Sequence, residues 1–178
     1  PVTINGDPVN QTSTAKLLCL RLGSHLTFSE HVNSAIRKTL SAMHGLLTLK
    51  RHGVKENSLI KFYQARILSI LSYATPGWHT YTSQLSKDAL ERHQSLCLRI
   101  IYPCINSYTE RLAKANITRI NELLSAKCIH YATKVANTPS HRLNHLIPPQ
   151  QSQVDASLTD VYYVHARLCC IPNLCLAN

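Results

Sequence analysis

Apolar residues recur every three or four positions through the middle of the chain, which is the pattern of amphipathic helices. The first helix is predicted to start at a capping box formed by Thr27 and Glu30. Gly53, which follows a run of cations, is predicted to stop it. The apolar stripe that we expect to face the core consists of Val32, Ile36, Leu40, Met43 and Leu47.

Two more long helices are predicted after the first. The second spans about 57–75 and is ended by Pro76 and Gly77. Its inward stripe is Leu59, Tyr63, Ile67, Ile70 and Ala74. The third begins near Ser83 or Ser86 and ends before Pro103. Its inward stripe is Leu85, Ala89, Leu96 and Ile100, widened by Leu90, Cys97 and Ile101.

An aromatic corner separates these two helices. We expect Tyr73 and Trp78 to pack against the kink there, with the indole N–H bonded to a nearby carbonyl. Stacking of these rings on a base or sugar is the alternative.

Two shorter helices complete the regular pattern. Ser107 and Glu110 form a second capping box, which predicts a helix to about Ala115. A last helix is predicted over 118–135, with Ile120, Leu124, Tyr131 and Val135 inward. Three prolines then predict a loop over 137–160. They are Pro139, Pro148 and Pro149.

Residues 1–28 favour extended structure. We predict a turn at Gly6-Asp7-Pro8 and a half-buried strand in which Leu18, Leu20 and Leu22 face one side. The fold class is therefore mainly α, a bundle of about five helices with a small N-terminal β-hairpin and an irregular C-terminal tail. The predicted divisions are 1–28, a helical domain at 29–136, and a loop and poorly ordered tail at 137–178.

Charge points to a polyanionic partner. The 178 residues carry a net charge of +10, and residues 29–142 alone hold 16 Lys or Arg against 6 Asp or Glu. Such a surface attracts nucleic acid by releasing its counterions. A basic face that only keeps the bundle soluble is the alternative. The cations predicted to contact phosphates are Arg37, Lys38, Lys50, Arg51, Lys61, Arg66, Arg92 and Arg99.

Cysteine usage and hydropathy limit the cellular compartments in which this chain is expected. The chain has 7 Cys and no C-x-x-C pair, which favours a reducing compartment, the cytoplasm or nucleus, over a disulfide scaffold. We expect Cys97 and Cys128 to act as small core hydrophobes, and His130 to lie at the surface. No run approaches the roughly 18 apolar residues of a membrane span, so no membrane contact is predicted.

Catalytic chemistry is missing from the sequence. Two-metal polymerisation needs paired carboxylates, but the 9 acids are scattered and no adjacent Asp pair exists. Asp88 and Glu91 share a helix face and are predicted to be solvated. His141 and His145 stand four apart, yet flanking prolines argue against a helical metal pair. We therefore predict no catalytic residue, no metal site and no cofactor in this chain.

The first 150 residues carry a series of short motifs in a fixed order. A strand at 16–23 is followed by Leu26, Thr27, Phe28 and His31. The corner motif comprises Tyr63, Ile67, Ile70, Tyr73, Ala74, Pro76 and Trp78. The last blocks are Leu90, Gln94, Leu98, Arg99, Ile100 and Ile101, then Pro139, His141, Leu143, Leu146, Ile147 and Pro148. In order and spacing they resemble the segment after the palm in reverse transcriptases of non-LTR retrotransposons, the jockey-like and CR1-like LINE elements.

The resemblance implies a helical thumb and linker that grips an RNA/DNA template–primer duplex beside the palm. The Y-x-D-D carboxylates and Mg²⁺ of an RNA-directed DNA polymerase would belong to that palm, and residues 1–28 would join it. The chain opens without Met, so we expect a fragment. Residues 155–178 depart from the family pattern, as a frameshifted or degenerate terminus would. The alternatives are a helical module that binds an acidic protein, and a decayed retroelement product that folds poorly.

Overall fold

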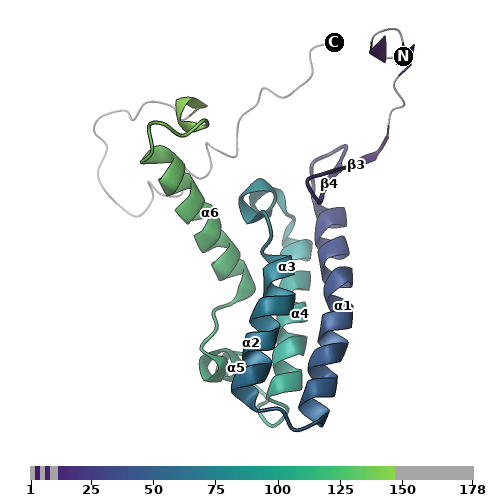
Figure 1. Ribbon diagram of the computed structural model, residues 1–178, viewed down its shortest axis with the longest axis vertical. Coiled ribbons are helices and arrows are strands. Elements are labelled where there is room, and N and C mark those ends of the chain that lie inside the picture. The colour runs from purple at the N-terminus through teal and green to yellow at the C-terminus, as the bar shows by residue number, and fades with distance from the viewer. Residues whose placement is uncertain (1–2, 5–6, 9–11, 147–178) are drawn as a thin grey trace.

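The computed structural model describes residues 3–4, 7–8 and 12–146, and this part of the chain is a mainly helical bundle preceded by hairpins (Figure 1). Helices α1 (Ser29–Arg51) and α4 (Gln84–Ile101) run side by side in the same direction. An antiparallel rod packs against both, formed by α2 (Glu56–Phe62), η1 (Tyr63–Leu68) and α3 (Ser69–Leu71). The predicted fold class, with about five helices and an N-terminal hairpin, is confirmed.

The rod differs from the predicted second helix in its register and its end. Segment η1 is π-helical, and a π-helix has more residues per turn than an α-helix, so positions four apart stay on one side. Leu59, Tyr63, Ile67 and Leu71 are all fully buried, whereas Ile70 is 36% exposed. The prediction of Ile70 as a core residue was therefore wrong, and the rod ends at Leu71 rather than near residue 75.

The two ends of α1 differ in how well they were predicted. Gly53 (φ 76°) donates its N–H to Lys50 O, and Val54 N–H bonds to Leu49 O. This pair of bonds is a Schellman ending that a glycine favours, so the predicted stop is confirmed. The predicted capping box at Thr27 is wrong. Phe28, with φ 53°, is the residue before the helix, and no side chain caps it. Its ring is buried, with 5% exposure.

The corner after the rod consists of two 3₁₀ turns, η2 (Thr75–Gly77) and η3 (His79–Tyr81). Trp78 is 1% exposed, and its Nε1–H donates to Tyr73 O at 2.8 Å. This bond confirms the predicted packing of the indole. The same prediction is wrong for Tyr73, which is 51% exposed and reaches Leu18 O through its hydroxyl at 3.4 Å.

After α4 the chain forms the short α5 (Tyr108–Ala115), the longer α6 (Ile120–Ala136) and the 3₁₀ turn η4 (Asn144–Leu146). Ser107 does precede α5, but its hydroxyl bonds to Thr109 rather than to a backbone N–H, so the second capping box is wrong. In α6, Tyr131 is 38% exposed, contrary to prediction. The buried row runs in steps of four and then three, through Ile120, Leu124, Cys128, Ala132 and Val135.

A polar clamp inside the bundle joins α4 to the start of α6. Gln94 is fully buried; its Oε1 accepts from Ile120 N–H at 2.7 Å and its amide donates to Thr118 O at 3.1 Å. The carboxylate of Glu91 accepts from Asn121 N–H at 3.1 Å. The Tyr108 hydroxyl lies 2.7 Å from both side chains. Glu91 is thus a structural acceptor, and its predicted solvated role was wrong.

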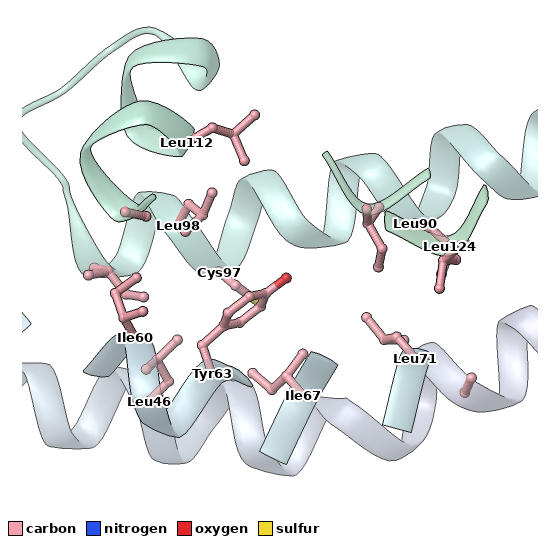
Figure 2. Close-up of a cluster of buried hydrophobic side chains, with 14 of the residues drawn as sticks. Leu46, Ile60, Tyr63, Ile67, Leu71, Leu90, Cys97, Leu98, Leu112 and Leu124 are labelled. Carbon is pink, nitrogen blue, oxygen red and sulfur yellow. The ribbon is translucent and has the colours of Figure 1, made fainter. Parts of the chain in front are cut away.

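The apolar core lies between α1, the rod and α4, and α5 and α6 add to it where they pack against α4. Figure 2 shows Tyr63 and Ile67 of the rod pointing toward Cys97 of α4, with Leu71, Leu90 and Leu124 nearby. Cys97 is fully buried and Cys128 is 3% exposed, so their predicted roles as core hydrophobes are confirmed. His130 is exposed, as predicted. Each leucine-sized side chain buried in this way contributes about 1.5–3 kcal/mol of transfer free energy.

Two antiparallel hairpins precede α1. Strand β1 (Thr3–Ile4) pairs with β2 (Asp7–Pro8), and β3 (Thr14–Leu17) pairs with β4 (Leu20–Gly23). Asp7 and Pro8 are therefore strand residues, not the predicted turn. The predicted single strand is a hairpin, because Leu18 and Cys19 both take positive φ angles and form its two-residue turn. Leu18 is 79% exposed rather than buried.

Two stripes predicted to form core are only partly buried. Their predicted members Val32, Leu90, Cys97 and Ile101 are fully buried, but others are not. In α4, Leu85 is 73% exposed and Leu96 is 40% exposed, while the buried side holds Leu90, Cys97 and Leu98 together with polar His93 and Gln94. In α1, Leu40 is 46% exposed, and Ile36, Met43 and Leu47 are half-buried. The core of α1 is built from Val32, Ala35, Thr39 and Leu46. Small and polar residues at the helix contacts displace the larger apolar residues from the core.

The predicted loop begins after α6, and residues 137–146 form turns ending in η4. The rest of the predicted loop and tail, residues 147–178, lies outside the described residues. Among the described helices, none is both long enough and apolar enough to cross a bilayer.

Candidate nucleic-acid interface

The eight cations predicted to bind phosphate all lie on α1, the rod or α4, outside the core. Lys50 is half-buried and the other seven are exposed, namely Arg37, Lys38, Arg51, Lys61, Arg66, Arg92 and Arg99. Exposure leaves these charged groups in water, where a polyanion can reach them.

Ion pairing separates Lys50 from the others. Its Nζ lies 3.9 Å from Glu56, which also pairs with Lys114 at 3.4 Å. The remaining recorded pair joins Arg119 and Glu122 at 4.0 Å. Within the described part of the chain, none of the seven exposed candidates has an acidic partner. Their charge is therefore not compensated inside the fold, whereas Lys50 serves the junction of α1, α2 and α5.

Four of the candidates fall on one side of the bundle. Residues seven apart on an α-helix lie on nearly the same side, because each advances by about 100°. Arg37 and Arg51 therefore share a side of α1, and Arg92 and Arg99 share a side of α4. We name this surface the α1/α4 face and define it by these arginines and by Leu40, Leu47, Leu85 and Leu96.

The packing of the bundle shows that the arginine-bearing sides of α1 and α4 are exposed on the same surface. Thr39 and His93 join α1 to α4 directly, at 2.8 Å. The rod covers the two helices from one side, where Gly45 of α1 faces the Phe62 ring. Arg51 and Leu40 are far round α1 from Gly45, and Arg92 is far round α4 from the buried Gln94. The α1/α4 face is thus the side opposite the rod.

Three further candidates lie on a different surface. Lys38 is seven positions before Gly45 and so lies on the side of α1 that adjoins α2. Arg66 follows Phe62 by one π-helical turn. Lys61 is exposed on α2, about 100° round that helix from Phe62. We name this surface the α1/η1 flank, defined by Lys38, Lys61 and Arg66. The predicted site is therefore divided between two adjoining surfaces instead of forming one row.

Among the described residues, acidic side chains lie on the α1/α4 face at one of its ends. Glu30 lies seven positions before Arg37 on α1, and Asp88 lies four before Arg92 on α4, where it accepts from Gln84 at 2.8 Å. Both acids sit at the N-terminal ends of their helices. Such carboxylates are favourable near a helix N-terminus, and the rest of the face remains cationic.

Two buried histidines near this face add little to its charge. His31 is 7% exposed and packs against Trp78 with ring centroids 5.1 Å apart. Burial lowers the pKa of His31, and the neighbouring charge of Lys38 lowers it further. Burial also lowers the pKa of His93. Both rings are therefore neutral at physiological pH.

Some basic side chains that sequence patterns leave unassigned have structural roles. Arg111 is 6% exposed and donates to Ile105 O at 2.8 Å and Asn106 O at 3.1 Å. Lys114 lies over the Tyr102 ring at 4.7 Å and Arg119 over the Tyr108 ring at 5.5 Å. Composition does not separate these residues from the free cations, since only the folded contacts distinguish them.

The described residues contain no group of three or more His, Cys, Asp or Glu placed to hold a metal ion. His141, which the sequence spacing pairs with His145 as a possible metal ligand, accepts through Nδ1 from Leu143 N–H at 3.2 Å. What the surface offers chemically is a set of unpaired cations beside exposed leucines. No protein-family model matches the chain, and neither the curated proteins nor the solved structures include a match.

Proposed function

We propose that this chain is a non-catalytic, thumb-like segment of a retroelement reverse transcriptase that binds the backbone of an RNA/DNA template–primer duplex. The observation that carries the proposal is the set of seven exposed candidate cations without an acidic partner in the described chain. Unpaired cations gain most from phosphates, because no internal ion pair has to break first.

Contacts of this kind position a duplex without reading its sequence. A polymerase thumb requires that property, since it must slide over any template. The palm of the parent protein would supply the paired carboxylates and Mg²⁺, which this sequence lacks, so the proposed role is grip rather than chemistry. The order of motifs along residues 1–150 is the reason for proposing that the parent protein is a retroelement reverse transcriptase.

The test is the affinity of the full chain for a short RNA–DNA hybrid, measured by fluorescence anisotropy over a range of salt. The proposal predicts micromolar binding that weakens steeply between about 50 and 200 mM salt. Hybrids of unrelated sequence should bind equally well. A folded chain that binds no hybrid at low salt would refute the proposal, and a chain without cooperative melting would favour a decayed product.

A helical module that binds an acidic protein is the second candidate function. The observation that favours it is the exposure of Leu40, Leu85 and Leu96 between arginines on the α1/α4 face, because phosphate binding gives no reason for leucines there.

A further inference from the structure

We propose that the α1/α4 face docks an amphipathic helix of another protein, one with acidic residues on both edges of its apolar stripe. This proposal concerns a protein partner and does not depend on nucleic-acid binding. It starts from Leu40, Leu85 and Leu96, which belong to stripes predicted as core but are left exposed by the bundle.

Apolar residues of this face recur seven positions apart on each helix, although on α4 one of the pair is an alanine. Leu40 and Leu47 are seven apart on α1, and Ala89 and Leu96 are seven apart on α4. Leu40 is 46% exposed, Leu85 73% and Leu96 40%. Ile36, Met43 and Ile100 lie beneath them, partly buried against the core. An incoming helix inserts its side chains between two such rows, as in a helical bundle.

Cations follow the same repeat on the outer edges. Arg37 and Arg51 are fourteen apart on the edge of α1, with exposed His44 midway between them, and Arg92 and Arg99 are seven apart on the edge of α4. The arginines on the α1 edge are separated by about 21 Å along the helix, from a rise of 1.5 Å per residue. This length matches a docked helix of about four turns.

The arrangement determines the charge of the partner. Flanking cations on both sides of an apolar seam select glutamate or aspartate at the matching edge positions of the docked helix. Four arginines against the two acids at one end also disfavour a second copy of this chain, since like charges would meet across the contact. An acidic amphipathic helix is therefore the occupant that fits both the leucines and the arginines.

The experiment uses the full chain and two synthetic 21-residue helices. Both peptides carry leucine at heptad positions a and d; one carries glutamate and the other lysine at e and g. Fluorescence anisotropy should give micromolar binding for the glutamate peptide and at least about tenfold weaker binding for the lysine peptide. Equal affinities, or no binding of the glutamate peptide, would overturn the proposal.

The double variant Leu40→Gln/Leu96→Gln locates the site. Both side chains are exposed, so the fold should persist, and binding of the glutamate peptide should fall by about tenfold or more. The matched control is Lys61→Gln/Arg66→Gln on the α1/η1 flank, which should keep peptide affinity. Unchanged peptide binding by the leucine variant would overturn the docking site. Affinity for the RNA–DNA hybrid, measured on the same variants, reports on the proposed function separately.

Discussion

Nε2 of His93 lies 2.8 Å from the hydroxyl of Thr39 and joins α4 to α1 inside the bundle. The Thr39 hydroxyl donates to Ile36 O at 2.7 Å, so it accepts from His93, whose neutral ring must carry its proton on Nε2. Protonation would add a charge at a ring that is 4% exposed. This one contact therefore links the packing of two helices to pH.

The first prediction is a loss of stability in mild acid. Burial lowers the pKa of His93 below its ordinary 6.5, and that of His31 is also lowered. A histidine with a lowered native pKa contributes stability that is complete above the unfolded pKa and is lost as pH falls toward the native one. Urea unfolding should therefore give a lower free energy of unfolding at pH 5 than at pH 7.5.

The variant His93→Gln provides the control for this effect. Its side-chain amide can still donate to Thr39 but cannot titrate, so the drop between pH 7.5 and pH 5 should shrink. A pH dependence as large as that of the parent chain would show that His93 does not cause it.

The second prediction is that alanine has opposite effects on stability at Gly45 and at Gly53. A Cβ on Gly45 would meet the Phe62 ring at 3.5 Å, an ordinary contact, within a regular helix. Gly45→Ala should therefore raise the free energy of unfolding by about 0.5–1 kcal/mol. Gly53 has φ +76° in the ending of α1, so Gly53→Ala should cost about 1–2 kcal/mol. Thermal melts of both variants check the pair, and a loss of stability on Gly45→Ala would contradict the described packing of α1 against α2.

The third prediction concerns the clamp between α4 and α6. Gln94→Leu would leave the buried Ile120 N–H without its acceptor and Thr118 O without its donor, at a cost of about 2–3 kcal/mol. Tyr108→Phe removes a single hydroxyl from the same network and should cost only about 1 kcal/mol. Denaturant titrations that gave the two variants equal stability would contradict the central position of Gln94.

The fourth prediction is a ranking of thiol reactivity. Burial raises the pKa of Cys97 to about 12, and the thiolate is the form that reacts. Cys19 and Cys104 are exposed. Brief treatment of the native chain with iodoacetamide, followed by peptide mass mapping, should modify Cys19 and Cys104 and leave Cys97 intact until denaturant is added. Early modification of Cys97 would show that the core between the rod and α4 opens readily.

Local chemistry predicted part of the fold, although both predicted capping boxes were wrong. The stop at Gly53 and the corner at Pro76 follow from backbone preferences that a residue carries into any context. The errors occur where tertiary contacts decide. A π-helical turn moved the core from Ile70 to Leu71, and no periodicity rule signals such a turn. Phe28 replaced the capping box because ring burial stabilises more than a single capping bond.

The candidate site was predictable in composition but not in arrangement. Sequence periodicity placed the cations off the apolar stripes, and all eight are outside the core. It also assigned Leu40 and Leu96 to the core, because an apolar stripe looks the same whether its partner is inside or outside the chain. Buried Thr39, His93 and Gln94 occupy the interior instead. Polar residues at core positions are the feature that periodicity cannot anticipate, and Leu40, Leu85 and Leu96 of the same helices are exposed.

Salt dependence of hybrid binding tests the central claim most directly. On a plot of log affinity against log salt, the triple variant Lys38→Gln/Lys61→Gln/Arg66→Gln should give a slope shallower than that of the parent chain by about one for each lost phosphate contact. Leu40→Gln/Leu96→Gln, which alters no charge, should leave the slope unchanged. A parent chain that is folded yet shows no salt-dependent affinity for the hybrid would contradict the claim that its unpaired cations bind a nucleic-acid backbone.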